Sequence, residues 1–321
     1  MPKETPGPMT ARDARRTNVR IGTASWTDRS LLESGRWYPD DVTSPEERLR
    51  YYASRFDFVE VDSTYYTADF EKQARAWAER TPSGFVFDVK AFRTFTLHQT
   101  PHKMLPRAVR DDLGEPPEGK RNWYYRDLPV DVRDELWTTF ERSLRPLVDA
   151  KKLGAIVLQF PVWAVPSPET KRHLQECADR LDAYRVAIEF RNKTWFNERG
   201  WRKTLSFLRE NGLAYVIVDE PQGFPSSVPP VWEVTDPRLS VVRLHGRNAE
   251  TWEKKGLKSA SERFNYKYDR KELRSFVDPV LAVAKQARDV HVTFNNNYED
   301  YPQVNAREFA QALERAAKAA A

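Results

Sequence analysis

Short apolar runs recur along the chain, and most of the gaps between them carry an amphipathic helical pattern. Eight of the runs are expected to be strands, because they are rich in β-branched residues or alternate between apolar and polar positions. They are VRIGTASW (19–26), FVEVDSTYY (58–66), FVFDVKA (85–91), GAIVLQF (154–160), VAIEFR (186–191), AYVIVDE (214–220), LSVVRLHG (239–246) and DVHVTFNN (289–296).

The gaps contain helical sequence such as SPEERLRYYASRF and PETKRHLQECADRLD. The first of these opens with Ser44, a good N-cap, followed by Pro45, which suits the first helical position. Strand alternating with helix eight times predicts a single (β/α)8 TIM barrel over residues 19–321. A doubly wound open sheet is disfavoured, because it usually has a Gly-rich turn after the first strand, and IGTASW contains only Gly22.

Two connections are too long to be plain helices, and both follow strands. One comes after the third strand and includes DDLGEPPEGKRNWYYRDLP; the other, GRNAETWEKKGLKSASERFNYKYDRKEL, comes after the seventh. Long segments at the carboxyl ends of barrel strands are usually lids or binding loops. Residues 1–18 are Pro-rich, charged and without periodicity, so they are expected to be a flexible tail.

Composition narrows the class of protein. The chain is 40% hydrophobic with ten Trp residues, which is typical of a folded globule. Its net charge is +5, but residues 1–20 hold five basic and two acidic side chains, so the charge of the barrel itself is weak support for a polyanionic partner. The single Cys177 excludes a disulfide framework, and we expect no membrane span and a cytoplasmic protein.

Polar side chains cluster near the carboxyl ends of the strands, and strand alternation places them on one face. Their neighbours on the other face are apolar, as a surface packed against helices must be. We therefore expect the polar set to point into the barrel mouth, although barrels also fill their interior with buried ion pairs. The set comprises Glu60, Asp62, Asp88, Lys90, Gln159, Glu189, Arg191, Asp219, Arg243, His245 and Asn295.

The ordered series IGTASW, VEVDSTYY, VKAFRTFT, GAIVLQFP, IEFRNKTW, VRLHG and TFNNNYEDYPQVNA resembles the motifs of the domain of unknown function 72 (YecE-like) family. The resemblance covers about residues 19–315 and implies a TIM barrel without an established reaction. The first strand departs from the family pattern, with Ala24-Ser25-Trp26-Thr27 where a cysteine and Gly-Trp-Tyr are frequent. The shared polar positions are Glu60, Lys90, Gln159, Glu189, Arg191, His245, Asn295, Asn296 and Asn305.

These groups suggest a set of chemical roles. Arg191, Arg243 and Lys90 suit capture of a phosphate or carboxylate. Glu189 is a candidate general base and His245 a candidate general acid, with Glu60 and Asp219 as further catalytic carboxylates. Whether Glu189 and Asp219 hold Mg²⁺ or Mn²⁺ is left open by the sequence.

Amides and aromatic residues past the strand ends are candidates for substrate binding. Asn295, Asn296 and Asn305 offer hydrogen bonds to a substrate, and turn formation is the alternative. Trp26, Tyr65, Tyr66 and Trp195 could form an aromatic wall for a planar or sugar ligand, and core packing is equally compatible with their positions. Gln159, near the end of the fourth predicted strand, belongs to the polar set and is a further candidate for substrate binding.

Three functions fit this pattern. The first is a hydrolase or lyase, such as a phosphodiesterase, acting on a phosphorylated or nucleic-acid-like substrate. The second is a glycosidase or sugar isomerase that uses a carboxylate pair such as Glu60 and Glu189. The third is a non-catalytic barrel that binds nucleic acid through basic loops, because residues 243–274 contain ten Lys or Arg against five Asp or Glu. The expected partner is thus an anionic small molecule or a nucleic acid.

Overall fold

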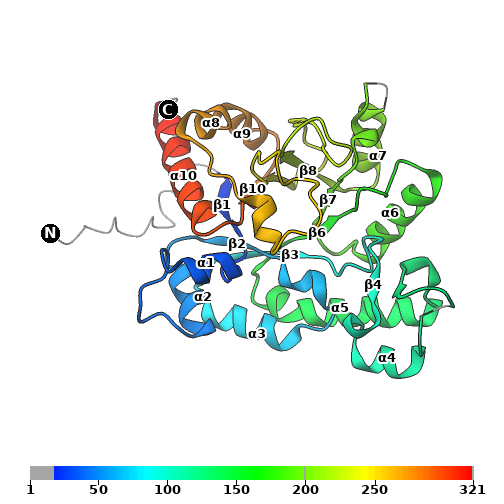
Figure 1. The fold of residues 1–321 in the computed structure, drawn as a ribbon. Coiled ribbons are helices and arrows are strands. Elements are labelled where there is room, and N and C mark those ends of the chain that lie inside the picture. Colours follow the sequence, from blue (N-terminus) through cyan, green and yellow to red (C-terminus); the bar gives the residue numbers. More distant parts are fainter. Residues whose placement is uncertain (1–17, 117, 199, 320–321) are drawn as a thin grey trace.

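The computed structural model describes residues 18–116, 118–198 and 200–319 (Figure 1). Eight parallel strands close into a barrel in the order β1-β10-β9-β8-β7-β6-β3-β2, which confirms the predicted (β/α)8 fold. Each begins within one residue of the run that predicted it. The barrel strands are β1 (Val19–Ala24), β2 (Phe58–Val61), β3 (Val86–Lys90), β6 (Leu153–Gln159), β7 (Val186–Glu189), β8 (Ala214–Asp219), β9 (Leu239–Leu244) and β10 (Asp289–Phe294).

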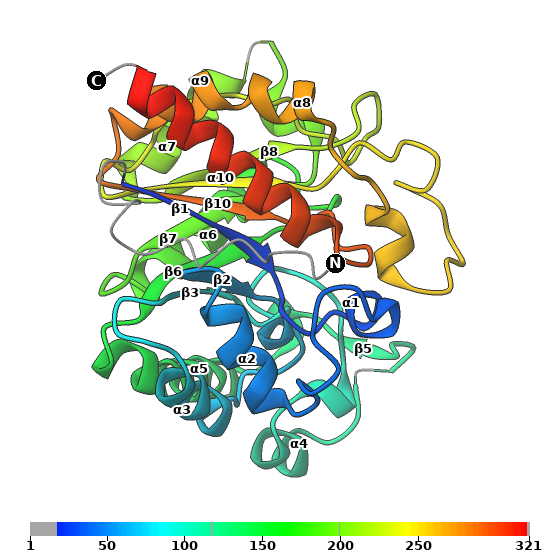
Figure 2. The ribbon, with the colours of Figure 1, turned by 90° about the vertical axis from the view of Figure 1, so that its left-hand side faces the viewer.

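Helices surround the barrel and bury the outward faces of the strands (Figures 1 and 2). The longest are α5, after the third barrel strand, and α10, which packs against β1 and β10. The α-helices are α1 (Arg29–Ser34), α2 (Pro45–Ala53), α3 (Glu71–Arg80), α4 (Arg107–Leu113), α5 (Val130–Asp149), α6 (Pro168–Arg180), α7 (Trp201–Glu210), α8 (Arg270–Ser275), α9 (Val277–Ala284) and α10 (Tyr301–Ala319). None of the helices in the described part of the chain is long and apolar enough to cross a membrane.

The start of α2 shows how local sequence sets an element boundary. The Ser44 hydroxyl accepts a hydrogen bond from the Glu47 N–H at 3.2 Å, and a Glu47 carboxylate oxygen accepts from the Ser44 N–H at 2.8 Å. This capping box satisfies two N–H groups that the helix itself cannot pair, and Pro45 fits the first turn because it needs no such partner. The predicted helix start is confirmed.

The two long connections differ in content. After β3 the chain forms η3 (His102–Met104), α4, η4 (Tyr125–Asp127) and a two-stranded antiparallel sheet of β4 (Thr100–Pro101) and β5 (Asn122–Trp123) before α5. The segment from β9 to α8 contains only η6 (Ala260–Phe264). In Figure 2 the β1 arrow points toward the side where α1, β5 and the segment after β9 lie, so both connections flank the carboxyl ends of the strands.

The predicted tail lies outside the described residues, except for its last member. Asn18 donates from its side-chain amide to the carbonyl oxygens of Ala284, Ala287 and Arg288 at 3.2, 2.5 and 2.8 Å. Asn18 therefore belongs to the barrel, because three hydrogen bonds tie it to the α9–β10 connection.

Asp88 does not lie at the mouth, which corrects the sequence prediction. Its two carboxylate oxygens lie 3.0 and 2.9 Å from Nδ1 of His291, in the middle of β10, and both side chains are buried. Gly154 on β6 makes room for this pair, because a Cβ there would lie 2.3 Å from an Asp88 oxygen. Asp88 points inward as expected but forms a buried hydrogen-bonded pair with His291 below the site, since it lies one inward-facing position before Lys90 on β3.

Candidate functional site

Arg243 lies at the centre of a buried ion cluster at the carboxyl ends of the strands. Its guanidinium donates from Nε and Nη2 to the two carboxylate oxygens of Glu60, at 2.9 and 2.5 Å, and from Nη1 to Glu189. All three side chains are completely buried. A buried guanidinium needs such full pairing, because an unpaired charge in the interior costs several kcal/mol. Arg243 therefore holds two carboxylates, and none of its three nitrogens is left for a substrate anion.

Glu189, the last residue of β7, faces four donors. One of its oxygens accepts from Gln159 Nε2 at 2.9 Å and from Arg191 Nη1 at 3.1 Å, and it lies 3.3 Å from His245 Nε2. Burial alone would raise the pKa of Glu189, but Arg243 and His245 hold it well below its ordinary value. Glu189 is therefore ionised and a poor proton acceptor, which argues against its predicted role as general base.

His245 is neutral, and its hydrogen bonds set its tautomer. Asn297 donates to the Asn295 carbonyl oxygen at 3.1 Å, so the Asn295 amide nitrogen, 2.8 Å away, faces His245 Nδ1 and donates to it. The proton of the ring is then on Nε2, facing Glu189. Burial lowers the pKa of His245 to about 4, despite the nearby carboxylate. The neutral imidazole of His245, whose Nε2 lies 3.3 Å from Glu189, helps to position that carboxylate. Because it lacks the extra proton of the imidazolium form, it is not suited to the predicted role of general acid.

Asp219 faces away from the mouth, which corrects a second sequence prediction. Neighbouring residues of parallel strands point the same way, and Val218 pairs with the inward-facing Arg243. Asp219 is therefore outward, where it accepts two hydrogen bonds from Arg247 Nε and Nη2, at 2.9 and 2.7 Å, and one from the Tyr268 hydroxyl at 2.7 Å. The structure does not bring Asp219 and Glu189 together as metal ligands, and no group of three or more His, Cys, Asp or Glu side chains among the described residues could hold a metal ion.

Glu220 takes the inward position instead, and the sequence prediction missed it. Its side chain is buried, with Oε1 accepting from the Val228 N–H at 2.6 Å and Oε2 lying 3.1 Å from Arg191 Nη1. Burial raises the pKa of Glu220 to about 8, although Arg191 opposes the shift. At neutral pH this carboxyl group holds its proton.

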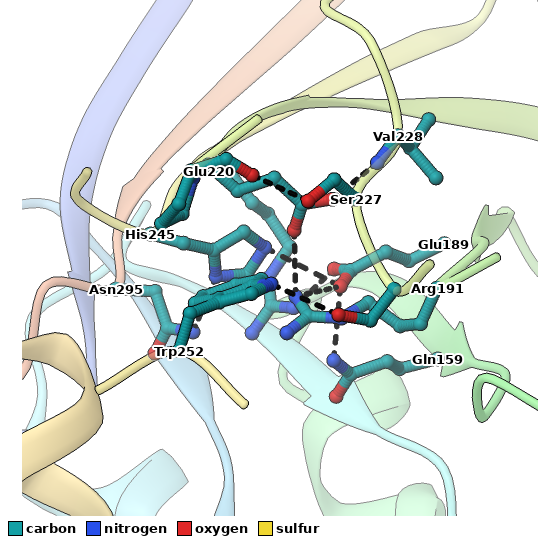
Figure 3. A network of polar contacts seen from close by, with 12 residues as sticks. Gln159, Glu189, Arg191, Glu220, Ser227, Val228, His245, Trp252 and Asn295 are labelled. Carbon is teal, nitrogen blue, oxygen red and sulfur yellow. Dashed lines mark hydrogen bonds and ion pairs between the residues drawn. The ribbon is translucent and has the colours of Figure 1, made fainter. Parts of the chain in front are cut away.

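Arg191 lies between Glu189 and Glu220 and beneath an aromatic ring. Its guanidinium carbon is 4.6 Å from the centre of the Trp252 ring, which comes from the segment after β9 (Figure 3). The side chain is 13% exposed, and among the described residues both carboxylate contacts use Nη1. Nη2 and Nε are therefore available to a ligand, so the predicted anion-binding role of Arg191 fits the geometry.

A second cationic group lies beside the first. Lys90, at the end of β3, is 3.4 Å from Asp62 and places its ammonium 5.1 Å from the centre of the Tyr65 ring. Arg93 places its guanidinium 5.0 Å from the centre of the same ring. Tyr65 belongs to η2 (Ser63–Tyr66), directly after β2. The structure thus brings Lys90 and Tyr65 together at the mouth as predicted, and adds Arg93.

The C-terminal amides mainly hold the protein together. Asn305 on α10 accepts from the Tyr268 N–H and from the Asn296 amide at 3.0 Å each, and donates to the Tyr268 carbonyl oxygen at 2.9 Å. Asn296 also donates to the Tyr266 carbonyl oxygen at 2.8 Å. Both amides are buried and anchor the segment before α8 to the end of β10. Of the predicted amides, Asn295 reaches the ion cluster, through His245.

Two predicted aromatic wall residues belong to the outer core. Trp195, in η5 (Lys193–Phe196), is fully buried, stacks on Phe190 with ring centres 4.2 Å apart and donates to the Ala164 carbonyl oxygen. Trp26 packs edge-on against Trp77 at 5.8 Å and lines a separate cavity of about 210 Å³ beside α2 and α3. Neither ring faces the ion cluster, because both lie on the side of the strands that packs against helices.

The fold and the site define a class of protein: a TIM barrel with a buried ion cluster at its mouth and cations on the rim. The chain belongs to the family described as "Protein of unknown function DUF72", whose model matches residues 20–321. The family resemblance of the sequence is confirmed.

Relatives support this assignment along most of the chain. The UPF0759 protein YunF of Bacillus subtilis is 32% identical over 281 residues, which cover 87% of this chain and 89% of that protein. The crystal structure of a DUF72 family protein from Enterococcus faecalis is similar with a TM-score of 0.74 and 27% identity, covering 92% of this chain and 95% of that one. A DUF72 family protein from Thermotoga maritima has a TM-score of 0.71 and 27% identity, covering 92% of this chain and 99% of that one.

Proposed function

We propose that the protein binds a phosphorylated or nucleic-acid-like anion at the carboxyl ends of the barrel strands and cleaves it as a hydrolase or lyase. The observation that supports this is a surplus of cations around His98. Burial, together with Lys90, Arg93 and Arg191, lowers the pKa of His98 to about 3. Three cations acting on one partly buried ring indicate a positive potential at the mouth, which favours an anionic ligand.

The protonation of Glu220 increases this potential. A carboxyl group with a pKa of about 8 is largely neutral at pH 7, so Glu220 does not cancel the charge of Arg191 there. The ionised partner of Arg191 is then Glu189, and Glu189 also pairs with Arg243. An anion bound at Arg191 would meet a fork with two nitrogens available, the geometry that guanidinium groups use for phosphate.

The same residues suggest how a phosphoester would be cleaved. In the hydrolysis, water attacks phosphorus and the P–O bond to the leaving oxygen breaks. Glu220 is protonated and lies next to Arg191, so it is our candidate for the donor of the proton that the leaving oxygen takes up. Arg191 would bind the phosphoryl oxygens, and Glu189 with His245 would hold Arg191 in place. This assignment replaces His245 with Glu220 as the general acid.

Turnover of phenyl phosphate and diphenyl phosphate, whose phenol leaving group is basic enough to need protonation, tests the proposal. Glu220→Gln should lower kcat by about 10²–10⁴-fold, since it removes a proton donor and keeps the shape of the side chain. Arg191→Met should raise KM for the same substrate. Arg209→Gln, which alters an exposed ion pair with Glu233, is the matched control and should leave both constants unchanged. If kcat is unchanged in Glu220→Gln and KM is unchanged in Arg191→Met, these roles are rejected.

A second candidate function, carbohydrate cleavage, has one specific observation in its favour. Glu189 and Glu220 both contact Arg191 Nη1 at 3.1 Å, and their pKa values are shifted in opposite directions. A glycosidase needs one ionised and one protonated carboxyl group in close proximity. The pair suggested by the sequence, Glu60 with Glu189, shows the same opposition, because burial raises the pKa of Glu60 to about 8. It fits less well because both side chains are bound to Arg243.

Aryl glycosides distinguish the two candidates. Hydrolysis of a p-nitrophenyl glycoside that is abolished in both Glu189→Gln and Glu220→Gln, without phosphoesterase activity, would favour the carbohydrate function. If neither substrate class is turned over but single-stranded nucleic acid binds with a steep salt dependence, the non-catalytic function is favoured.

A further inference from the structure

Large apolar side chains are exposed at one part of the barrel rim. Trp163 is 53% exposed and Tyr66 54%, while most other aromatic residues of the chain are buried in the core. Trp163 belongs to the connection after β6, four residues beyond Gln159, which itself hydrogen-bonds to Glu189. Tyr66 follows β2. Both therefore come from segments that begin at the ion cluster.

These rings are connected by two others into a continuous strip. The ring centres of Tyr66 and Tyr65 are 5.0 Å apart, those of Tyr65 and His98 are 5.2 Å apart, and those of His98 and Trp163 are 5.7 Å apart. We call Tyr65, Tyr66, His98 and Trp163 the rim strip. Each contact is edge-to-face, a favourable arrangement for aromatic pairs. The rim strip thus runs along the mouth beside the cations.

The backbone is strained where it holds Trp163. Leu97 has a φ of +63°, a left-handed conformation that is unfavourable for a residue with a Cβ. Its carbonyl oxygen accepts a hydrogen bond from the Trp163 indole nitrogen at 3.1 Å. On the other side, the Asn192 amide donates to the Val162 carbonyl oxygen. Strain of this kind persists where the surrounding structure holds it and is concentrated at ligand sites.

Arg93 next to the rim strip has an unsatisfied buried donor. Among the described residues, its Nε is buried without a hydrogen-bond partner, and no carboxylate forms an ion pair with it. The hydrogen bond that its Nη1 makes within the described ranges goes to the sulfur of Met104 at 3.5 Å, a weak acceptor. A buried guanidinium donor without an oxygen partner is costly, so Arg93 is suited to an anion that arrives with a ligand.

We propose that the rim strip and Arg93 form a subsite for a planar aromatic ring that carries an anionic group, as in a nucleotide or an aryl phosphate. The ring lies against Trp163 and His98, and the anion lies at Arg93 and Lys90. His98 suits the ring because it is neutral at working pH and offers a flat, weakly hydrated face. This inference rests on the proposed function and names its substrate class.

Binding of three matched probes tests the subsite on the full-length protein by isothermal titration calorimetry. Adenosine 5′-monophosphate has the ring and the anion, ribose 5-phosphate only the anion, and adenosine only the ring. The wild-type protein should bind the monophosphate about tenfold more tightly than ribose 5-phosphate, since one stacked base contributes this much or more. Equal affinities, or no binding of the monophosphate at millimolar concentration, would overturn the inference without any variant being needed.

Variants then assign the two halves of the subsite. Trp163→Ala should weaken binding of the monophosphate about tenfold and leave binding of ribose 5-phosphate unchanged. Trp163→Phe should retain most of the affinity for the monophosphate because it keeps a ring. Arg93→Gln should weaken binding of both phosphates and leave binding of adenosine unchanged. Val130→Ala, an exposed apolar residue on α5 outside the rim strip, is the control. A monophosphate affinity unaffected by Trp163→Ala contradicts the inference.

Failure of the subsite and failure of the proposed function have different signatures. If Trp163 controls binding of the monophosphate but Glu220→Gln leaves turnover unchanged, the proposed cleavage is wrong and the subsite stands. If turnover depends on Glu220 and Arg191 but Trp163→Ala does not alter the preference for ring-bearing phosphates, the subsite is wrong and the cleavage stands.

Discussion

Glu189 and Glu220 contact the same nitrogen, Nη1 of Arg191, each at 3.1 Å, yet at neutral pH Glu189 is ionised and Glu220 is protonated. Within the described part of the chain, Glu189 has two guanidinium groups and a histidine around it, whereas Glu220 has only Arg191 and one backbone N–H. Both are buried, so the number of donors decides which one keeps its proton. A buried acid and a buried carboxylate are thus held side by side.

The stability of the protein should depend on pH through Glu220. Its folded-state pKa of about 8 is above the ordinary value of 4.5, so the folded state retains a proton that the unfolded chain releases. The free energy of unfolding should therefore fall as pH rises from 4.5 to 8, with this group contributing up to about 1.4 kcal/mol per pH unit. Glu220→Gln should remove that slope and be the more stable protein at pH 8.

Urea denaturation at pH 5, 6, 7 and 8 measures this difference. Glu250→Gln, at an exposed position of the segment after β9, is the control and should keep the wild-type slope. If the free energy of unfolding changes with pH in the same way in the wild-type protein and in Glu220→Gln, then Glu220 is ionised in the folded state.

Arg243→Met should be strongly destabilising. It leaves Glu60 and Glu189 buried without their common cation, and removal of one partner from a buried ion pair costs about 3–5 kcal/mol. Adding Glu60→Gln should recover part of the loss, because it removes one of the two buried carboxyl groups that have lost their partner. Arg209→Ala, in an exposed pair with Glu233, should cost at most about 1 kcal/mol. Urea denaturation compares the three variants; equal losses for Arg243→Met and Arg209→Ala would show that the buried cluster contributes little.

His245 should not titrate between pH 5.5 and 8.5. Burial lowers its pKa to about 4, and its hydrogen bond from Asn295 predicts a neutral ring with the proton on Nε2. Nitrogen chemical shifts of the imidazole would report both the tautomer and the charge. Asn295→Asp places a carboxylate at Nδ1 and should raise the pKa of His245, since a nearby negative charge favours the imidazolium form. A wild-type midpoint near 6.5 would contradict the buried network.

Asn305→Ala should lower stability without changing the affinity for any ligand. The change leaves the Tyr268 N–H and carbonyl oxygen without their partner, at a cost of about 1–3 kcal/mol. Asn305→Asp keeps the acceptor for the Tyr268 N–H but places a buried carboxylate oxygen against the Tyr268 carbonyl oxygen, so it should cost at least as much at pH 7. Thermal unfolding and phosphate binding measured on the same samples separate the two effects. A selective loss of binding would instead support the substrate-contact role suggested by the sequence.

Alternation along the strands predicted most of the inward-facing residues correctly. In VEVD and IEFR, polar residues alternate with buried apolar ones, so Glu60 and Glu189 could be assigned to the inner face from the sequence. The same holds for Gln159 and Arg243. In each case one face of the strand packs against helices, so apolar residues on that face alternate with polar residues on the other, and the alternation can be recognised in the sequence.

The prediction failed where the sequence has no such contrast. AYVIVDE is apolar on both faces until Asp219 and Glu220, so a shift of one residue is invisible in its pattern. The pairing of Ala214 with Ala187 and of Val218 with Arg243 decides which acid faces the site. Arg93, His98 and Trp163 were missed for a related reason, because they lie in connections that have no strand period.

By itself the sequence determined the barrel, its helix starts and which strand ends carry charged groups, because these depend on periods and caps that extend over a few residues. Only the tertiary structure decided the charge states. Arg243 meets Glu60 across 183 positions of the chain and Glu189 across 54. The protonation of a buried carboxyl group depends on the donors within a few ångströms of it in space, and distance along the chain carries no information about them.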